Sequence, residues 1–166
     1  MPEPHIAQIA LGLGSNTGDR LAYLQAAIEA LAPYVIVTAK SQVYEVAPAY
    51  VSDQPAFLNA VVVGTTKLEP LALLWLLKDI ESEIGRTPTY HYGPRIIDID
   101  MLFYDDAIIA TPELTLPHPR LGEREFVLRP LSEVAPTWRH PQNNQTAAEM
   151  LAVLPDSGMK CLGAVL

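Results

Sequence analysis

Apolar residues recur along the chain in six successive patterns, four typical of β-strands and two typical of amphipathic helices. Short runs rich in valine and isoleucine, alternating in part with small or polar residues, predict strands, whereas recurrence every three to four positions predicts helices. The strands are expected over residues 8–13, 35–45, 57–65 and 96–103, and the helices over 21–31 and 70–84. Pro33 just beyond the first helix and Gly85 at the end of the second support these boundaries.

The order β-α-β-β-α-β lacks the parallel βαβ repetition that builds a doubly wound sheet. It favours an α+β fold, a ferredoxin-like three-layer α-β-α sandwich with a mainly antiparallel central sheet. Residues 46–55 and 87–94 are expected to be loops. Prolines interrupt the region after 103, until a capping box from Thr146 to Glu149 starts a short last helix. No repeat or linker divides residues 1–166, so we expect a single domain.

Composition and charge narrow the range of partners. The 166 residues are 49% hydrophobic and carry a net charge of −8, which disfavours nucleic acid and anionic membranes as partners. The single cysteine, Cys161, excludes an internal disulfide framework and indicates a reducing compartment. The N-terminus lacks a signal-peptide pattern, and no apolar run approaches the ~20 residues of a membrane span. We therefore expect a cytoplasmic protein, and a monomer.

Asp98 and Asp100 carry the strongest chemical signal in the chain. Within a strand they project to the same face, about 7 Å apart at their β-carbons, while Ile97, Ile99 and Met101 project to the other. Such a pair suits Mg²⁺, which takes one or two protein carboxylates and completes its shell with phosphate oxygens and water. On the Asp-x-Asp pattern alone, the alternative is a solvated strand edge whose two acids bind nothing.

The basic residues of the second half of the chain strengthen this interpretation. Six of the 11 basic residues lie between positions 86 and 139, and all six are arginines. Guanidinium groups stay charged and bind phosphate through paired hydrogen bonds, which predicts a polyphosphate clamp around the carboxylates. The alternative is ordinary surface ion pairing, to which Arg129 and Arg139 are assigned. The six residues are Arg86, Arg95, Arg120, Arg124, Arg129 and Arg139.

Three other features are weaker by themselves. The glycines between residues 12 and 18 have the spacing G-x-G-x-x-x-G, which does not match a dinucleotide-binding loop and indicates a tight strand-to-helix connection. His118 lies between two prolines, where it could donate to phosphate, act as a base or pack within a loop. Phe57 and Asn59 share a strand face, so one could stack on a flat ring while the other binds its edge. A core position for Phe57 is the alternative.

Taken in this order, the motifs resemble the 6-hydroxymethyl-7,8-dihydropterin pyrophosphokinase family of folate biosynthesis over nearly the whole chain. The segment from Tyr92 to Asp100 is the most specific, in combination with Phe57–Asn59. The other matching segments are 14–16, 53–59, 85–86, 117–120, 124–126 and 129–131. The resemblance implies the three-layer fold described above. It also implies transfer of the pyrophosphoryl group of ATP to the hydroxymethyl oxygen of the pterin, with release of AMP.

The resemblance further implies roles for individual residues. Asp98 and Asp100 would hold two Mg²⁺ ions and, with Arg86 and Arg95, form the catalytic group. The residues implied to bind the nucleotide are Arg86, Arg95, Thr115, His118, Pro119 and Arg124. Those implied to bind the pterin are Val46, Ala47, Pro48, Ala49, Phe57, Asn59, Tyr92, Asp98 and Phe126. Within that set, Phe57 and Phe126 would sandwich the ring and Asn59 would read its polar edge.

The sequence departs from the family pattern in details. Tyr92 stands where some members have tryptophan and Phe57 where some have tyrosine, and residues 87–91 are less basic than in some members. These changes concern closure of the loops 46–55 and 87–94, expected to act as lids, rather than the reaction. Two other functions fit the same residues: a different magnesium-dependent phosphotransferase or nucleotidyltransferase, and a non-catalytic nucleotide-binding module with the arginines as a passive clamp.

Overall fold

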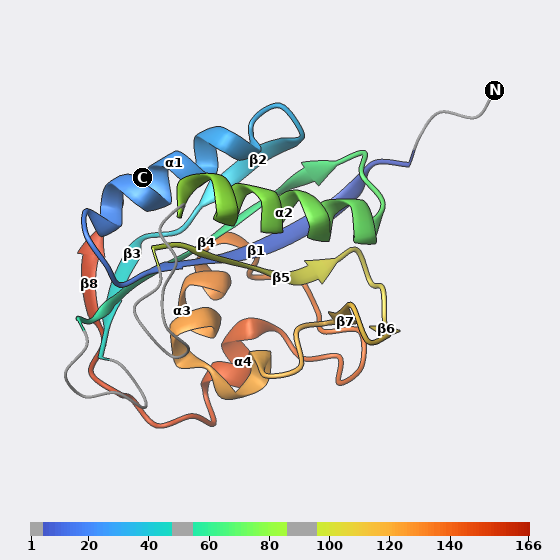
Figure 1. Cartoon of the computed structure of the whole chain (residues 1–166). Coiled ribbons are helices and arrows are strands. Elements are labelled where there is room, and N and C mark those ends of the chain that lie inside the picture. The colour runs from blue at the N-terminus through green and yellow to red at the C-terminus, as the bar shows by residue number, and fades with distance from the viewer. Residues whose placement is uncertain (1–4, 48–54, 86–95) are drawn as a thin grey trace.

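The computed structural model describes residues 5–47, 55–85 and 96–166 (Figure 1). Helices and strands follow one another along these residues with short connections. In chain order the elements are β1 (Ala7–Ser15), α1 (Arg20–Leu31), β2 (Val35–Lys40), β3 (Val43–Val46), β4 (Phe57–Thr66), α2 (Pro70–Ile84), β5 (Asp98–Tyr104), β6 (Ile109–Ala110), β7 (Thr115–Leu116), a 3-10 turn (Leu121–Glu123), α3 (Glu125–Val134), α4 (Ala147–Leu151) and β8 (Lys160–Gly163).

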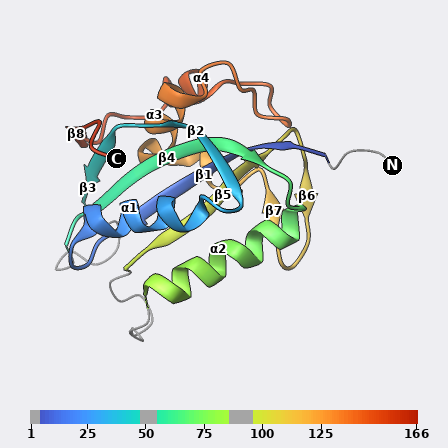
Figure 2. The same ribbon diagram turned by 90° about the horizontal axis from the view of Figure 1, so that it is seen from above.

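One sheet organises the molecule. Strands β5, β1, β4, β3 and β8 lie side by side in this order, and β2 also pairs with β4. Each of these pairings is antiparallel. Helices α1 and α2 cover one face of the sheet, and α3 and α4 cover the other, as Figures 1 and 2 show. The predicted three-layer α-β-α sandwich with an antiparallel central sheet is therefore confirmed.

Two apolar clusters fill the spaces between the layers, one on each face of the sheet. In β1, Ile9, Leu11 and Leu13 belong to the cluster beneath α1 and α2, whereas Ala10 belongs to the one beneath α3 and α4. The first cluster also contains Leu24, Leu31, Leu73 and Leu77, and the second contains Leu102, Phe103, Leu128 and Leu131. A shift of β1 by one residue would exchange its two faces, so burial on both sides fixes the register that places the site.

The predicted strand over 35–45 is wrong in its middle, because the chain forms two strands there. β2 pairs with the end of β4 and β3 with its beginning, and Ser41 lies between them. The Ser41 N–H donates to the Val61 carbonyl at 2.9 Å, and the Ser41 hydroxyl accepts from the Val61 N–H at 2.9 Å. The side chain thus replaces the carbonyl that a regular ladder would supply, and the strand is interrupted.

The region after residue 103, for which the sequence predicts no helix before Thr146, contains α3. Its residues Val127, Leu128 and Leu131 are buried against the sheet, so packing stabilises the helix although Pro130 lies inside it and lacks an N–H. The predicted capping box at Thr146 is confirmed, since its hydroxyl accepts from the Glu149 N–H at 3.2 Å. Throughout the described residues, no helix has the length and apolar character needed to cross a bilayer.

Candidate active site

Asp98 and Asp100 lie at the start of β5, on the face of the sheet that α3 covers. The alternate residues Ile97, Ile99 and Met101 are buried in the cluster beneath α1 and α2, which places the two carboxylates on the opposite face. Both aspartates are partly exposed. The predicted alternation is confirmed, and the two carboxylates are accessible to a ligand from the same side.

On the neighbouring strands, a glycine and an asparagine lie side by side with Asp98, and together these residues form a row across the sheet. Gly14 of β1 pairs with Asp98 on one side and with Asn59 of β4 on the other. Tyr44 of β3 pairs with Asn59 and extends the row. Directly paired residues project to the same face of a sheet, and adjacent strands lie about 4.8 Å apart. A carboxylate and a carboxamide therefore flank a position that has no side chain.

Asn59 supplies a polar group to this row, and Phe57 supplies an aromatic group beside it on the same face of β4. Asn59 is only 9% exposed, and its carboxamide has no hydrogen-bond partner among the described residues. Phe57 is partly exposed and lies close to Gly14, with its Cδ1 3.8 Å from the point where a Gly14 Cβ would lie. A carboxamide that no described protein group engages, beside an accessible ring, indicates a site for a flat, polar ligand.

His118 follows β7 and lies close to Asp100. Its backbone N–H donates to the Leu102 carbonyl at 3.1 Å, which fixes the turn to β5. Its Nδ1 accepts from the Arg120 N–H at 3.2 Å, so Nε2 carries the proton of the neutral ring. Burial lowers the pKa of His118, and nearby Asp100 opposes this effect. The neutral imidazole is thus suited to donate a hydrogen bond, one of the three roles that the sequence left open.

Arg124 and Phe126 stand at the beginning of α3, on the same side of the sheet. The Arg124 guanidinium carbon lies 5.6 Å from the centroid of the Phe126 ring. Its charge is also close enough to His118 to act on the pKa of that imidazole. The stacked ring limits the orientations of the guanidinium, which is a favourable arrangement for binding an anion.

Two other arginines form the ion pairs to which the sequence assigned them. Arg129 lies 3.1 Å from a Glu125 carboxylate oxygen, and Arg139 lies 3.2 Å from one of Glu149. The interpretation of these two arginines as structural is confirmed. Arg120, at 3.4 Å from Glu123 in an exposed pair, also has an acidic neighbour.

The remaining predicted residues divide into two groups. Thr115, Pro119 and Ala47 are exposed, and Val46 at the end of β3 is partly exposed. The predictions for Arg86, Arg95, Tyr92, Pro48 and Ala49, and those for residues 48–54 and 87–94 of the lids, lie outside the described residues.

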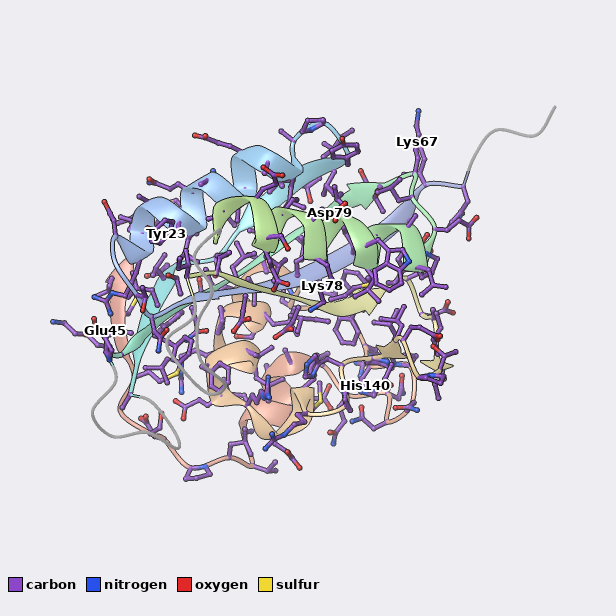
Figure 3. All side chains as sticks on the ribbon, in the orientation of Figure 1. Tyr23, Glu45, Lys67, Lys78, Asp79 and His140 are labelled. Atoms are coloured by element: carbon purple, nitrogen blue, oxygen red, sulfur yellow. The ribbon has the colours of Figure 1, made fainter. Side chains whose placement is uncertain are left out.

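Polar contacts between α1 and β3 stabilise the end of the sheet at which the row lies. Arg20, the first residue of α1, lies 3.0 Å from a Glu45 carboxylate oxygen and donates to the Ala56 carbonyl at 2.7 Å. Figure 3 shows Glu45 at this end of the molecule, with Tyr23 of α1 above it. The two contacts connect α1 to β3 and to the segment that enters β4, just before Phe57.

Glu81 of α2 is a functional candidate that the sequence analysis missed. Its carboxylate accepts from the Ile99 N–H at 2.8 Å, between the two aspartates of β5, and lies 3.4 Å from the Lys78 ammonium. Burial raises the pKa of Glu81, and the negative charge of Asp98 adds to the effect. Glu81 therefore holds the backbone that carries both carboxylates. In the sequence it is one of several acids near the end of a helix, with no pattern that marks it.

The donor set around Asp98 and Asp100 fits a magnesium ion that is shared with a substrate. No group of three or more histidine, cysteine or acidic side chains is placed to hold a metal within residues 5–47, 55–85 and 96–166. Two carboxylates alone leave most positions of an octahedral shell to other oxygens, and Mg²⁺ commonly fills them with phosphate and water. The described residues thus fit a phosphate-bound cation rather than a closed structural metal site.

Comparison with known proteins identifies relatives. The model of the family described as 7,8-dihydro-6-hydroxymethylpterin-pyrophosphokinase (HPPK) matches residues 10–136. The chain is 44% identical over 152 residues to 2-amino-4-hydroxy-6-hydroxymethyldihydropteridine pyrophosphokinase of Methylorubrum extorquens, over 90% of this chain and 95% of that protein. It resembles the fold of a solved Plasmodium falciparum HPPK-DHPS A437G structure, with a TM-score of 0.74, 17% identity and coverage of 90% of this chain and 46% of that one.

Other relatives are much longer than this chain. It is 39% identical over 150 residues to folic acid synthesis protein FOL1 of Dictyostelium discoideum, which is 90% of this chain but 23% of that protein. The family match, by contrast, begins in β1, ends just after α3 and includes both aspartates of β5. The chain therefore belongs to the 7,8-dihydro-6-hydroxymethylpterin-pyrophosphokinase family.

Proposed function

We propose that this chain transfers the pyrophosphoryl group of ATP to the hydroxymethyl oxygen of 6-hydroxymethyl-7,8-dihydropterin and releases AMP, as a step of folate synthesis. One observation carries the proposal: the Asp98 carboxylate and the Asn59 carboxamide flank Gly14 in a single row. The first group suits a metal-bound phosphate and the second suits the edge of a polar ring. This arrangement supports a site for both substrates on one face of the sheet.

The reaction requires two reactants to be held in line. The hydroxymethyl oxygen attacks the β-phosphorus of ATP and forms a new O–P bond, while the bond from that phosphorus to the oxygen bridging the α- and β-phosphates breaks. The hydroxyl proton passes to solvent, and AMP leaves. Catalysis of such a transfer comes mainly from positioning and from neutralising charge on the phosphates.

Asp98 and Asp100 are the residues that would hold two Mg²⁺ ions. Bound magnesium supplies neutralisation of phosphate charge and a lowered pKa for a coordinated hydroxyl. Arg86 and Arg95 would add positive charge to the transferred and leaving groups. The neutral Nε2–H of His118 would donate to a phosphate oxygen, with the Arg124 guanidinium beside it.

The remaining contacts divide between the two substrates. For the pterin, Phe57 and Phe126 would stack on the ring and Asn59 would bind its edge, together with Asp98, Tyr92 and residues 46–49. For the nucleotide, Thr115 and Pro119 would line the site, together with the phosphate-binding residues. Asp98, Asn59 and Phe57 share the α3 side of the sheet with Phe126, which supports one continuous site.

The function is tested by incubating the protein with MgATP and the dihydropterin and identifying the products. We expect AMP and the pterin pyrophosphate, and loss of both products when EDTA removes the metal. Formation of ADP or of free pyrophosphate would instead indicate a different phosphotransferase or nucleotidyltransferase. Nucleotide binding without turnover would indicate a non-catalytic binding module.

Glu81→Ala is expected to lower kcat by about tenfold, with a smaller change in the KM for ATP. The variant leaves the Ile99 N–H without its charged acceptor, and hydrogen bonds to charged groups contribute roughly 1.5–3 kcal/mol. The strand segment that carries both aspartates then loses its support, although no group that contacts substrate is removed. Steady-state kinetics of AMP formation, with circular dichroism to verify folding, measure the effect.

Two further variants test whether Glu81 acts through this hydrogen bond. Glu81→Gln keeps an acceptor oxygen and should retain most of the activity. Asp79→Asn removes an exposed acid from the same helix, which Figure 3 labels, and should match the wild type. A Glu81→Ala protein with wild-type kcat would show that the contact does not align the aspartates.

A single domain over residues 1–166, a monomeric state and a cytoplasmic location belong to the same proposal. The one cysteine, Cys161, is exposed and free, which is compatible with a reducing compartment. Size-exclusion chromatography with light scattering measures the oligomeric state, and cell fractionation measures the location.

A further inference from the structure

Gly14 occupies the centre of the row described above, and the space around it is smaller than a methyl group requires. An ideal Cβ built on Gly14 would lie 2.9 Å from the Asn59 carboxamide oxygen. The backbone at Gly14 is not in the left-handed region that favours glycine, which among the described glycines is confined to Gly18, Gly158 and Gly163. The nearby carboxamide oxygen, and not the backbone conformation, is therefore what an added side chain at this position would displace.

Gly12 provides an internal comparison. It lies two residues earlier on the same strand and face, opposite Asp100 and Val61. The atom nearest to a Cβ there would be a methyl carbon of Leu102 at 3.5 Å, which is an ordinary van der Waals distance. Of the two glycines, only Gly14 lies so close to a polar side chain that an added Cβ would clash with it.

On the side away from Gly14, Asn59 pairs with Tyr44 of β3. This tyrosine is buried, and its hydroxyl donates to the Glu133 carboxylate of α3, which also accepts from the Gln42 N–H at 3.0 Å. Asn59 therefore lies between a fixed ring on β3 and the bare backbone of β1.

We propose that Gly14 determines the specificity of the site for the pterin, because the absence of a side chain lets the Asn59 carboxamide lie across β1 towards Asp98. This inference rests on the proposed function. A carboxamide presents one acceptor and two donors, and the pyrimidine ring of a pterin presents complementary groups along its edge. In that orientation the carboxamide binds the ring edge while the hydroxymethyl group extends towards the carboxylates. Gly14 acts through Asn59 and is a positioning residue.

The first experiment measures binding of 6-hydroxymethyl-7,8-dihydropterin by calorimetry, with magnesium and a non-hydrolysable ATP analogue present. Gly14→Ala is expected to raise the Kd of the pterin by ~10-fold or more, the effect of losing one or two hydrogen bonds to a buried ligand. The Kd of the ATP analogue should change by less than ~2-fold, below the scale of one lost hydrogen bond. Gly12→Ala is the size-matched control and should bind the pterin like the wild type.

A double-mutant cycle tests whether Gly14 acts through Asn59. In an Asn59→Ala background the clashing oxygen is gone, so adding Gly14→Ala should change the pterin Kd by less than ~2-fold. Losses that multiply across the two sites would overturn the proposal. So would wild-type pterin affinity in the Gly14→Ala protein.

The same cycle is read from thermal unfolding if Gly14→Ala does not fold well enough for calorimetry. Recovery of the unfolding midpoint when Asn59→Ala is added would support the contact, whereas a double variant as unstable as Gly14→Ala would overturn it. Failure of the proposed function has a different signature, because the wild type itself would then bind no dihydropterin. Failure of this inference alone leaves the wild type binding and Gly14→Ala indistinguishable from it.

Discussion

Asp98→Ala and Asp100→Ala are each expected to lower kcat by at least ~10²-fold, the scale of removing a principal electrostatic contribution at the transferred group. Both carboxylates project from one face of β5, and no group of three or more histidine, cysteine or acidic side chains among the described residues is placed to hold a metal. With either carboxylate removed, a metal-bound phosphate would lose one of the two acids of β5. The rate of AMP formation at saturating MgATP and pterin measures the effect.

Measurements of stability distinguish this loss of activity from misfolding. The two aspartates are partly exposed, and the free energy of unfolding of each variant, measured by urea denaturation, shows whether the fold is retained. Asp98→Asn and Asp100→Asn keep the size of the side chain and should be nearly as inactive as the alanine variants. Asp79→Ala, which removes an exposed acid on α2, serves as the control. Near-normal activity in either aspartate variant would refute the assignment of both as magnesium ligands.

Phe103→Ala is expected to lower the free energy of unfolding by about 3–5 kcal/mol, as for other buried aromatic residues. Phe103 is 2% exposed in the cluster beneath α3 and α4. Its ring stacks on Trp138 with centroids 5.1 Å apart, and the His140 ring meets its edge at 6.0 Å. Truncation would leave a cavity and remove both ring contacts, with a fall in Tm of roughly 2–4 °C per kcal/mol for a chain of this length.

Urea denaturation measures this change, and two variants serve as references. Phe103→Leu keeps much of the buried volume and should lose less than half as much stability. Ile108→Ala truncates an apolar side chain that is 56% exposed and should have little effect. A loss below ~1 kcal/mol in Phe103→Ala would show that the space collapses around the smaller residue instead of remaining open.

The features that the sequence predicted correctly are those that depend on one segment alone. The alternation of β5 places Asp98 and Asp100 on one face without reference to any other strand. The capping box at Thr146 is likewise a contact between residues three apart. Such features follow from the period of a strand or the first turn of a helix, and they persist in any fold that keeps the segment intact.

The parts that the sequence could not predict depend on contacts between distant segments. The row through Gly14 requires the registers of β1 with both β4 and β5, which burial on two faces determines. The hydrogen bond from Ile99 to Glu81 requires α2 to pack beside β5. α3 was missed because Pro130 disfavours a helix locally, whereas its buried leucines contribute only once the sheet is present.

The contact between Glu81 and Ile99 has a second consequence, for association between molecules. In the part of the chain that the structure describes, β5 is an outermost strand of the sheet. Outermost strands present unpaired N–H and C=O groups, to which a strand of another molecule can add and begin aggregation. The Glu81 carboxylate occupies one of these donors at 2.8 Å and places negative charge beside it. The residue that aligns the two aspartates thus also removes one donor from the edge to which another strand could add.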